Sequence, residues 1–218
     1  MEDVLDVSQR PPDPARPRVC FDESGKELQA DVRPSLLPRP GRPARTDREY
    51  QRPGRANLFL GCAPPRGQRQ VTVTERRTRT DWAEQMRTLV EDHFPDAERI
   101  VLVRDNRNIH TAASRYATFP PAEAKRIWDK LEGPHPPIHG SWRNMAEIEL
   151  SVLARQCRHR RLPDRETLTH EVEAWVVERN GAQVTSDWQF TTDDARVKLK
   201  RLYPVSQSDN SRRAEYSA

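Results

Sequence analysis

A chain of 218 residues is long enough for one domain with a buried core, but this one is polar, with 34% hydrophobic and 32% charged residues. Its acidic start and the lack of a long apolar run exclude a secretory signal peptide and a membrane span, so we expect a cytoplasmic protein. The three cysteines are odd in number and far apart, which argues against a disulfide framework and predicts buried thiols at Cys20, Cys62 and Cys157.

Positive charge is concentrated in a Pro- and Gly-rich stretch between Arg33 and Arg79, while the rest of the chain is net acidic. All basic residues of this stretch are arginines, whose planar guanidinium groups suit bidentate contacts with phosphate. We therefore predict a basic, DNA-contacting arm over residues 33–56. The candidate contacts in it are Arg39, Arg42, Arg45, Arg52 and Arg55. On composition alone, a solvated and disordered linker is the alternative.

The first part of the chain predicts a leader and three strands. Residues 1–17 form a Pro-rich leader that we expect to be flexible, and the first strand follows over Arg18 to Asp22. After the basic arm, A-N-L-F-L-G-C-A and Q-V-T-V-T predict two strands joined at P-P-R-G. Two strands joined so closely indicate an antiparallel hairpin.

The middle of the chain predicts a helix followed by the central strand. Thr80 or Asp81 caps a helix that extends to about His93. The apolar face of this helix is made by Trp82, Met86, Leu89 and Val90. From Arg99 to Arg104 the continuous apolar run I-V-L-V is typical of a strand inside a sheet.

Helices follow to the end of the chain. The first begins at Pro120 and Pro121 and continues through Leu131. Asn144 caps the second, from Met145 to about Gln156, and Asp164 caps the third, from Arg165 to Asn180. Thr192 caps the last, from Asp193 to Tyr203. We expect residues 205–218 to be a disordered tail. This order of elements predicts an α/β fold, with a mixed sheet flanked by helices.

Three acidic residues stand out against this order of elements. Asp22 and Asp105 end β-type runs, and Glu147 lies in the first turn of the helix that Asn144 caps. Carboxylates that a fold brings together from distant elements hold divalent metal ions in enzymes that cut phosphodiesters. On a helical wheel Glu149 is nearer the apolar stripe than Glu147, so the helix geometry alone does not select the third carboxylate.

Long motifs at these places resemble a known family. D-N-R-N-I-H, H-G-S-W-R-N-M-A-E-I-E-L-S-V-L and F-T-T-D-D-A-R-V-K-L-K-R-L-Y-P are similar to the catalytic domain of bacterial insertion-sequence transposases of family six-thirty, relatives of the mariner transposases. The resemblance implies one DDE catalytic domain over residues 18–204, with a ribonuclease-H-like fold. It also implies that Asp22, Asp105 and Glu147 form the catalytic and metal-binding triad. Glu147 is chosen because it stands three residues after an asparagine, as in mariner-type sequences.

The resemblance also implies cofactors and partners. Two Mg²⁺ ions, with Mn²⁺ as a substitute, would support hydrolysis at the transposon ends and strand transfer into target DNA. Further DNA contacts would come from Asn106, Asn108, His110, His139 and Trp142. The active complex would be a homodimer in a bacterial cell, nucleoid-associated when bound to DNA. Because only about twenty residues precede the first strand, a separately encoded helix-turn-helix half would supply specific recognition.

Some residues depart from the family's pattern. Prolines interrupt residues 131–139, where the family has a strand, and Arg104, Arg107 and Arg143 stand at positions that are usually apolar. These departures define an alternative, a truncated and catalytically inactive remnant that binds DNA only non-specifically. An unrelated basic RNA-binding protein is a third hypothesis, which the scarcity of aromatic residues in the basic stretch weakens.

Overall fold

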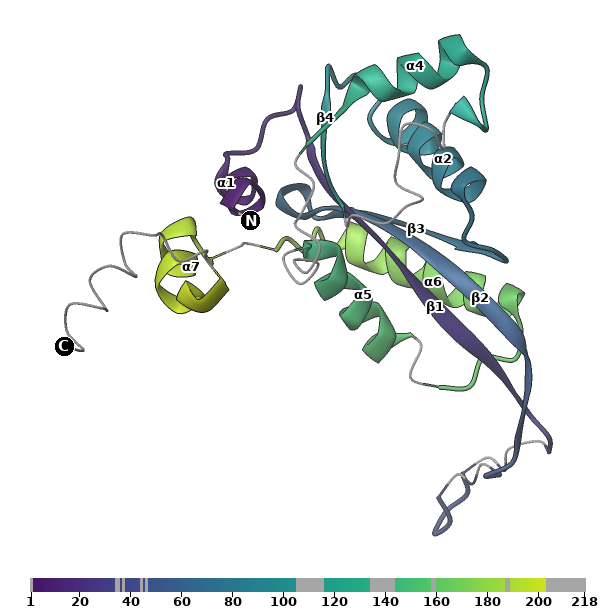
Figure 1. Ribbon diagram of the computed structural model, residues 1–218. Coiled ribbons are helices and arrows are strands. Elements are labelled where there is room, and N and C mark those ends of the chain that lie inside the picture. Colours follow the sequence, from purple (N-terminus) through teal and green to yellow (C-terminus); the bar gives the residue numbers. More distant parts are fainter. Residues whose placement is uncertain are drawn as a thin grey trace, which may run out of the picture. The chain divides into compact units, whose positions relative to one another are not determined.

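Figure 1 shows the computed structural model, which describes residues 2–33, 36, 38–43, 45, 47–104, 116–133, 144–157, 160–186 and 189–202. The chain divides into two compact units. The larger consists of residues 11–187 and the smaller of residues 1–10 and 188–218. Among the described residues, no helix is both long and apolar enough to cross a membrane.

A five-stranded mixed sheet, in the order β3-β2-β1-β4-β5, forms the centre of the larger unit. Its strands are β1 (Arg18–Asp31), β2 (Tyr50–Ala63), β3 (Gln68–Thr74), β4 (Ile100–Arg104) and β5 (Leu131–Glu132). β1 pairs antiparallel with β2 and parallel with β4. The predicted hairpin of β2 and β3 is confirmed, with the short 3-10 turn η1 (Pro64–Arg66) between the strands. β4 is buried along its whole length inside the sheet, as its apolar run predicted.

β1 is much longer than its apolar residues indicate. The prediction that this strand ends at Asp22 is wrong, because β1 pairs with β2 as far as Asp31 opposite Tyr50. The two strands extend together beyond the rest of the sheet (Figure 1), where the first six residues of β2 are exposed. Backbone hydrogen bonds sustain this pairing without an apolar pattern. An irregularity just after Leu28 takes in Pro53, which has no N–H to donate to the partner strand.

Helices cover both faces of the sheet (Figure 1). They are α2 (Arg79–Thr88), continued by the π-helical turn η2 (Leu89–His93), α4 (Pro121–Lys130), α5 (Met145–Gln156) and α6 (Arg165–Gly181). Asn144 and Asp164 cap α5 and α6, as predicted. The predicted cap of α2 is wrong by two residues or more: Thr78, rather than Thr80 or Asp81, is the cap. Thr78 takes this place because it forms a reciprocal capping box with Asp81.

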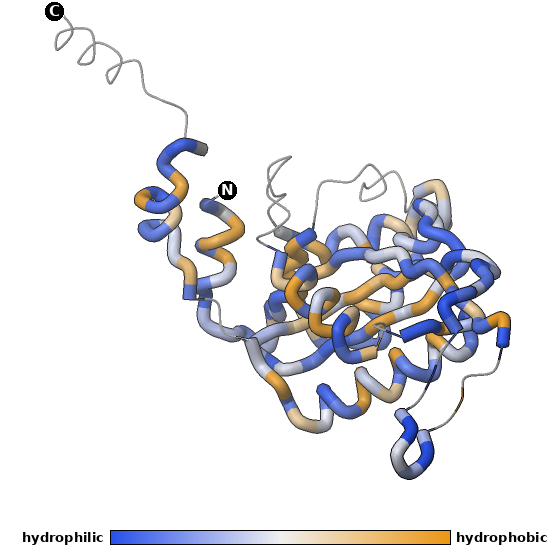
Figure 2. Tube along the Cα trace, turned by 90° about the horizontal axis from the view of Figure 1, so that it is seen from below, coloured by the Kyte–Doolittle hydropathy of each residue, from blue (hydrophilic) through white to orange (hydrophobic). Residues whose placement is uncertain are grey.

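The hydrophobic core lies between the sheet and the layer of α2 and α4. The predicted apolar face is confirmed, since Trp82, Met86, Leu89 and Val90 are all buried. They belong to one cluster with Phe21 of β1, Phe59 of β2 and Ile127 of α4. On the other face, α5 contacts β1 and β2, and α6 contacts β3. Figure 2 shows hydrophobic residues gathered along the strands between these helices, where burial of their apolar surface stabilises the unit.

The smaller unit joins residues from both ends of the chain. It contains α1 (Glu2–Gln9), α7 (Thr192–Lys198) and the 3-10 turn η4 (Lys200–Leu202). The guanidinium group of Arg196 binds both carboxylate oxygens of Glu2, at 2.8 and 2.9 Å. α1 lies in the leader and was not predicted, because a helix this short depends on contacts with residues distant in sequence. Thr191, rather than the predicted Thr192, caps α7 through a capping box with Asp194.

Candidate active site

Asp22 lies in the buried part of β1, on the face of the sheet that α5 covers. It is 6% exposed, and its Oδ1 accepts a hydrogen bond of 2.8 Å from the backbone N–H of Glu23. Side chains two residues apart on a strand share a face, so Asp22 lies on the same side as Cys20. The thiol of Cys20 contacts the backbone of Met145, the first residue of α5. The carboxylate of Asp22 is therefore on the side of the sheet where α5 begins.

Asn144 joins the start of α5 to β1. Its Nδ2 donates to the backbone carbonyl of Phe21 at 2.7 Å, and its Oδ1 accepts from the backbone N–H of Ala146 at 3.2 Å. The residue is 1% exposed, so water does not compete for these bonds. The sequence predicted the cap but not the bond to β1, because no local pattern connects residues so far apart. This bond holds the first turn of α5, which carries Glu147, against the strand that carries Asp22.

The two glutamates of α5 have different surroundings. Glu147 is half-buried, and no described residue forms a hydrogen bond or ion pair with its carboxylate. Glu149 is 3% exposed, and both of its oxygens are held. Arg69 donates to them at 2.9 and 3.1 Å, and Arg179 donates to one of them at 3.3 Å. Glu149 could bind a metal ion only by leaving the buried Arg69 without its counter-charge, so Glu147 is the better candidate.

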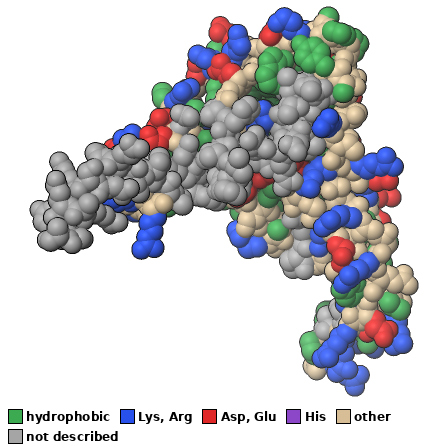
Figure 3. Space-filling view, in the orientation of Figure 1, with side chains coloured by type: hydrophobic (Ala, Val, Ile, Leu, Met, Phe, Trp, Pro, Cys, Tyr) green, Lys and Arg blue, Asp and Glu red, His purple; other side chains and the backbone are tan. Residues whose placement is uncertain are grey.

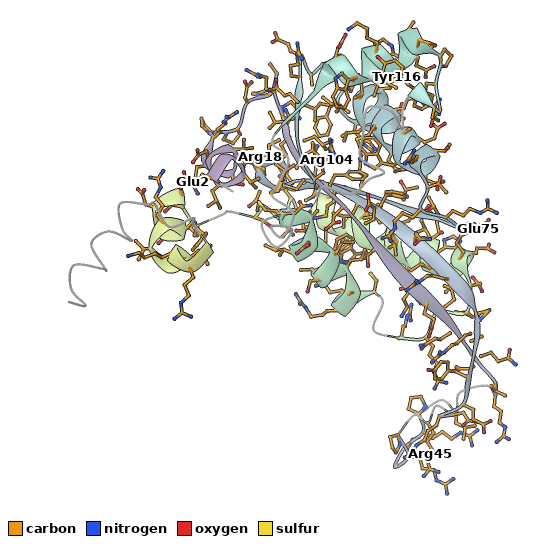
Figure 4. The ribbon with its side chains drawn as sticks, in the orientation of Figure 1. Glu2, Arg18, Arg45, Glu75, Arg104 and Tyr116 are labelled. Atoms are coloured by element: carbon orange, nitrogen blue, oxygen red, sulfur yellow. The ribbon has the colours of Figure 1, made fainter. Side chains whose placement is uncertain are left out.

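β4 ends beside the part of β1 that carries Asp22. Arg104, its last residue, pairs with Phe21 in the parallel register. The guanidinium group of Arg104 lies 5.6 Å from the centroid of the Trp82 ring, a cation–π contact that accommodates arginine at a position where the resemblance implied an apolar residue. Figure 4 shows Arg104 in the middle of the larger unit.

Several predicted site residues lie outside the described part of the chain. Asp105 follows Arg104 directly in the sequence and is one of them. The others are Asn106, Asn108, His110, His139 and Trp142. Of the predicted triad, the structure thus describes Asp22 and Glu147.

The donor groups near Asp22 are suited to a hard divalent cation. Among the described residues, no cluster of three or more His, Cys, Asp or Glu side chains could hold a metal ion, but Asp105 is not among them. The cysteines are buried free thiols, as predicted. Cys20 and Cys62 stand opposite each other, and the hydrogen bond between them raises the pKa of Cys62 and lowers the pKa of Cys20. The two thiols are thus engaged with each other, and the carboxylate oxygens of Asp22 and Glu147 are the hard donors that fit Mg²⁺ or Mn²⁺.

The arginine-rich stretch continues the β1–β2 hairpin. Leu36 and Arg45, and then Arg39 and Arg42, pair through backbone hydrogen bonds of 2.8 to 3.1 Å. The tight turn between Arg39 and Arg42 contains Gly41, whose φ of 77° favours glycine. Where it is described, the stretch is thus a narrow hairpin with exposed arginines. Figure 3 shows Arg side chains standing out at its end, and Figure 4 labels Arg45 there.

Arg161, which precedes α6, holds the base of this hairpin. It donates to the carboxylate of Asp31 at 2.6 Å, and its guanidinium group lies 5.1 Å from the centroid of the Tyr50 ring.

The two candidate DNA contacts on β2, Arg52 and Arg55, differ in their ion pairs. Arg52 forms an ion pair of 3.2 Å with an acidic residue of β1, whereas the exposed Arg55 forms no ion pair with a described carboxylate.

Comparisons with known proteins give a family and a fold. The family model described as DDE superfamily endonuclease matches residues 17–169. Among solved structures, the chain is similar to the Mos1 mariner paired end complex with Mn, with a TM-score of 0.50 and 17% sequence identity over 83% of this chain and 55% of that chain. It is also similar to a pre-cleavage Mos1 transpososome, with a TM-score of 0.48 and 18% identity over 84% of this chain and 59% of that chain.

At such identities the likeness concerns the fold. The five-stranded mixed sheet with helices on both faces is the ribonuclease-H-like architecture that the motifs implied, and the prediction of fold class is confirmed. The chain spans little more than half the length of the chains in these solved structures. No curated protein sequence matches it.

Proposed function

The chain belongs to the DDE superfamily endonucleases, and from that premise we propose that it carries the catalytic domain of a DNA transposase. Residues 18–204 form this domain, and residues 33–56 form its DNA-contacting arm. The proposed reactions are metal-dependent hydrolysis of phosphodiester bonds and transfer of the freed strand into target DNA. Among such enzymes, the insertion-sequence transposases of family six-thirty share the motifs of this chain.

The observation that carries the proposal is that the side chain of Asn144 joins β1, which contains Asp22, to α5, which contains Glu147. It bonds to Phe21, directly before Asp22, and to the first turn of α5, where Glu147 lies. The backbone segments that carry these two acidic residues, far apart in sequence, are thereby tied together, which supports a shared site for their carboxylates. Glu147, unlike Glu149, has a carboxylate that no described residue occupies.

Chain connectivity supports Asp105 as the third member of the site. Arg104 stands beside Phe21, and a trans peptide bond keeps the Cα atom of the next residue about 3.8 Å from that of Arg104. Neighbouring strands in a sheet are about 4.8 Å apart. We therefore propose Asp105, the next residue along the chain from Arg104, as a ligand of the same site as Asp22.

Asp22, Asp105 and Glu147 are the proposed ligands of two Mg²⁺ ions, for which Mn²⁺ can substitute. When bound, such ions supply an activated water or 3′-hydroxyl and stabilise the leaving oxygen. The burial of Asp22 limits access of bulk water to its carboxylate and lowers the local dielectric, which strengthens its attraction for a divalent cation. No covalent intermediate with the protein is needed for the in-line displacement.

Nicking of supercoiled plasmid DNA tests this function. We expect the chain to nick the plasmid with Mg²⁺ or Mn²⁺, to lose this activity in EDTA, and to lose it in both metals when Asp105 is replaced by alanine. Metal-independent nicking, or equal nicking by the Asp105→Ala variant, would contradict the proposal. If neither protein nicks although both bind DNA, the assay is repeated with a helix-turn-helix half added in trans. Inactivity there as well would favour the inactive remnant.

Partners follow from the same proposal. DNA is the substrate, both as transposon ends and as target, and the active complex contains two copies of the chain. The description of the similar structure as a paired end complex with Mn supports this arrangement. A separately encoded helix-turn-helix half is proposed for specific recognition, and the bacterial nucleoid as the place of action. The proposed contacts near the metal site are Asn106, Asn108, His110, His139 and Trp142.

The proposed DNA-contacting arm predicts how strongly the affinity for DNA depends on salt. We propose that Arg39, Arg42, Arg45, Arg52 and Arg55 contact phosphates. Replacing Arg39 and Arg42 by alanine removes two charges from the end of the hairpin. Because each phosphate contact releases about 0.9 counterion, the slope of log affinity against log salt should fall by roughly 2. Titration of fluorescent duplex DNA at several salt concentrations measures that slope.

A matched variant removes the same charge from another surface. Lys125 and Arg126 are exposed on α4 and form ion pairs with Asp129 of α4 and Glu91 of η2, so their replacement by alanine should leave the slope nearly unchanged. Equal effects of the two double variants would mean that net charge, and not the arm, determines the affinity.

A further inference from the structure

Asn144 bonds to the residue directly before each of the two described candidate ligands. Its Nδ2 donates to the carbonyl of Phe21, which precedes Asp22, and its Oδ1 accepts from the N–H of Ala146, which precedes Glu147. We propose that Asn144 is a positioning residue that sets the separation of the two carboxylates and so tunes the affinity of the site for metal. This inference rests on the proposed function.

The choice of an amide is what distinguishes this residue from an ordinary helix cap. Asn, Asp and Ser cap helices about equally well, because the cap needs only a side-chain oxygen. The bond to Phe21 needs a donor, which an ionised carboxylate lacks. The other caps of the larger unit, Thr78 and Asp164, are exposed and make no described bond to a strand through their side chains. At Asn144, one side chain therefore does two things: it caps α5 and ties it to β1.

Burial makes this tie specific. Asn144 is 1% exposed, and the carbonyl that it meets belongs to Phe21, which is fully buried inside the sheet. Without the amide, the carbonyl of Phe21 in β1 loses its hydrogen bond to the start of α5. The first turn of the helix is then free to shift relative to the strand. A shift of this kind moves Glu147 with respect to Asp22 without unfolding either element. Outer residues that orient metal ligands in this way typically change metal affinity by about 10- to 100-fold when they are removed.

Replacement by serine separates the two bonds of Asn144. The Asn144→Ser hydroxyl can still cap α5, but it lies one bond short of the position from which the amide nitrogen reaches Phe21. Asn144→Ala removes both bonds. Asp164→Ala is the matched control, because it removes a cap from α6, where Oδ1 of Asp164 accepts from the N–H of Thr167 at 2.7 Å, and touches no candidate ligand.

The experiment measures binding of Mn²⁺ to the 218-residue chain by electron paramagnetic resonance, without DNA. We expect Asn144→Ser and Asn144→Ala to bind Mn²⁺ at least about tenfold more weakly than wild type, and Asp164→Ala to bind it with unchanged affinity. Hydrogen exchange of the Ala146 amide, which donates to the side chain of Asn144, gives a second readout. Asn144→Ser should keep its protection, since the cap remains, whereas Asn144→Ala should lose it. The Glu147 amide donates to the backbone carbonyl of Asn144 and should stay protected in both variants.

The outcomes separate the two proposals. If Asn144→Ser binds Mn²⁺ as tightly as wild type, or if Asp164→Ala weakens binding equally, the positioning role of Asn144 is wrong while the metal site stands. If wild type binds no Mn²⁺, or if Asp22→Asn binds it as well as wild type, the proposed metal site itself fails and this inference fails with it.

Discussion

Glu147→Gln is expected to lose metal-dependent nicking by about a hundredfold or more while the protein keeps its fold. The change replaces a charged oxygen ligand by a neutral amide of the same shape. A metal ion contributes several kcal/mol to such a reaction, and about 2.7 kcal/mol corresponds to a hundredfold in rate. Because Glu147 is half-buried and forms no hydrogen bond or ion pair with a described residue, its replacement breaks no described contact, and we expect the fold to be kept. Plasmid nicking and thermal unfolding, measured side by side, check both halves of this prediction.

Glu166 provides the matched control for this change. It lies in the first turn of α6 as Glu147 lies in the first turn of α5, so both carboxylates interact similarly with a helix dipole. Glu166→Gln should nick DNA as wild type does. Full activity of Glu147→Gln would show that the third ligand lies elsewhere in the chain, and equal losses in both variants would point to the helix dipole instead of a ligand.

The elements that the sequence predicted well are those whose signals are local. Asn144 and Asp164 fix the starts of α5 and α6, and Pro121 fixes the start of α4, because a cap or a helix-opening proline acts within one turn. β4 was predicted from its apolar run, since a strand buried on both faces needs one. In each case, the residues that determine the element lie inside it or next to it.

The elements that were missed or cut short depend on distant parts of the chain. The second half of β1 is a strand because β2 pairs with it, and neither strand has an apolar pattern there. α1 depends on α7, which lies almost two hundred residues further along, through contacts such as the ion pair between Arg196 and Glu2. Composition correctly marked residues 33–56 as basic and rich in proline, but it did not show that residues 50–56 belong to β2.

The same limit applies to the candidate site. The sequence selected Asp22 and Asp105 as residues at the ends of apolar runs and left Glu147 and Glu149 undecided by helix geometry. The wheel placed Glu149 nearer the apolar side, and the structure agrees, since Glu149 is buried. Its arginine partner Arg69 is 80 positions away along the chain, so no spacing rule could have indicated the pair. Only the folded chain shows that Glu149 is engaged by buried partners, whereas Glu147 has no partner among the described residues.

Glu149→Gln is expected to lower the free energy of unfolding by about 3 to 5 kcal/mol, the typical cost of removing one partner of a buried ion pair. The side chains of Arg69 and Glu149 are 1% and 4% exposed, so the charge of Arg69 would remain inside the protein without its counter-charge. Urea unfolding measures the loss. Glu173, exposed on α6, is the control, and Glu173→Gln should change the stability by no more than about 0.5 kcal/mol.

A double variant shows whether the loss comes from the uncompensated charge. Arg69→Met combined with Glu149→Leu removes both charges and leaves apolar side chains of similar volume, so it should be less destabilised than the sum of its two single changes. A loss of under 1 kcal/mol in Glu149→Gln would mean that Glu149 is not held by Arg69. The preference for Glu147 over Glu149 as the metal ligand would then lose the support that comes from Glu149 being engaged, and only the motif and the hydrogen bonds of Asn144 would favour Glu147. Stability of one variant thus tests which of two neighbouring carboxylates is available for catalysis.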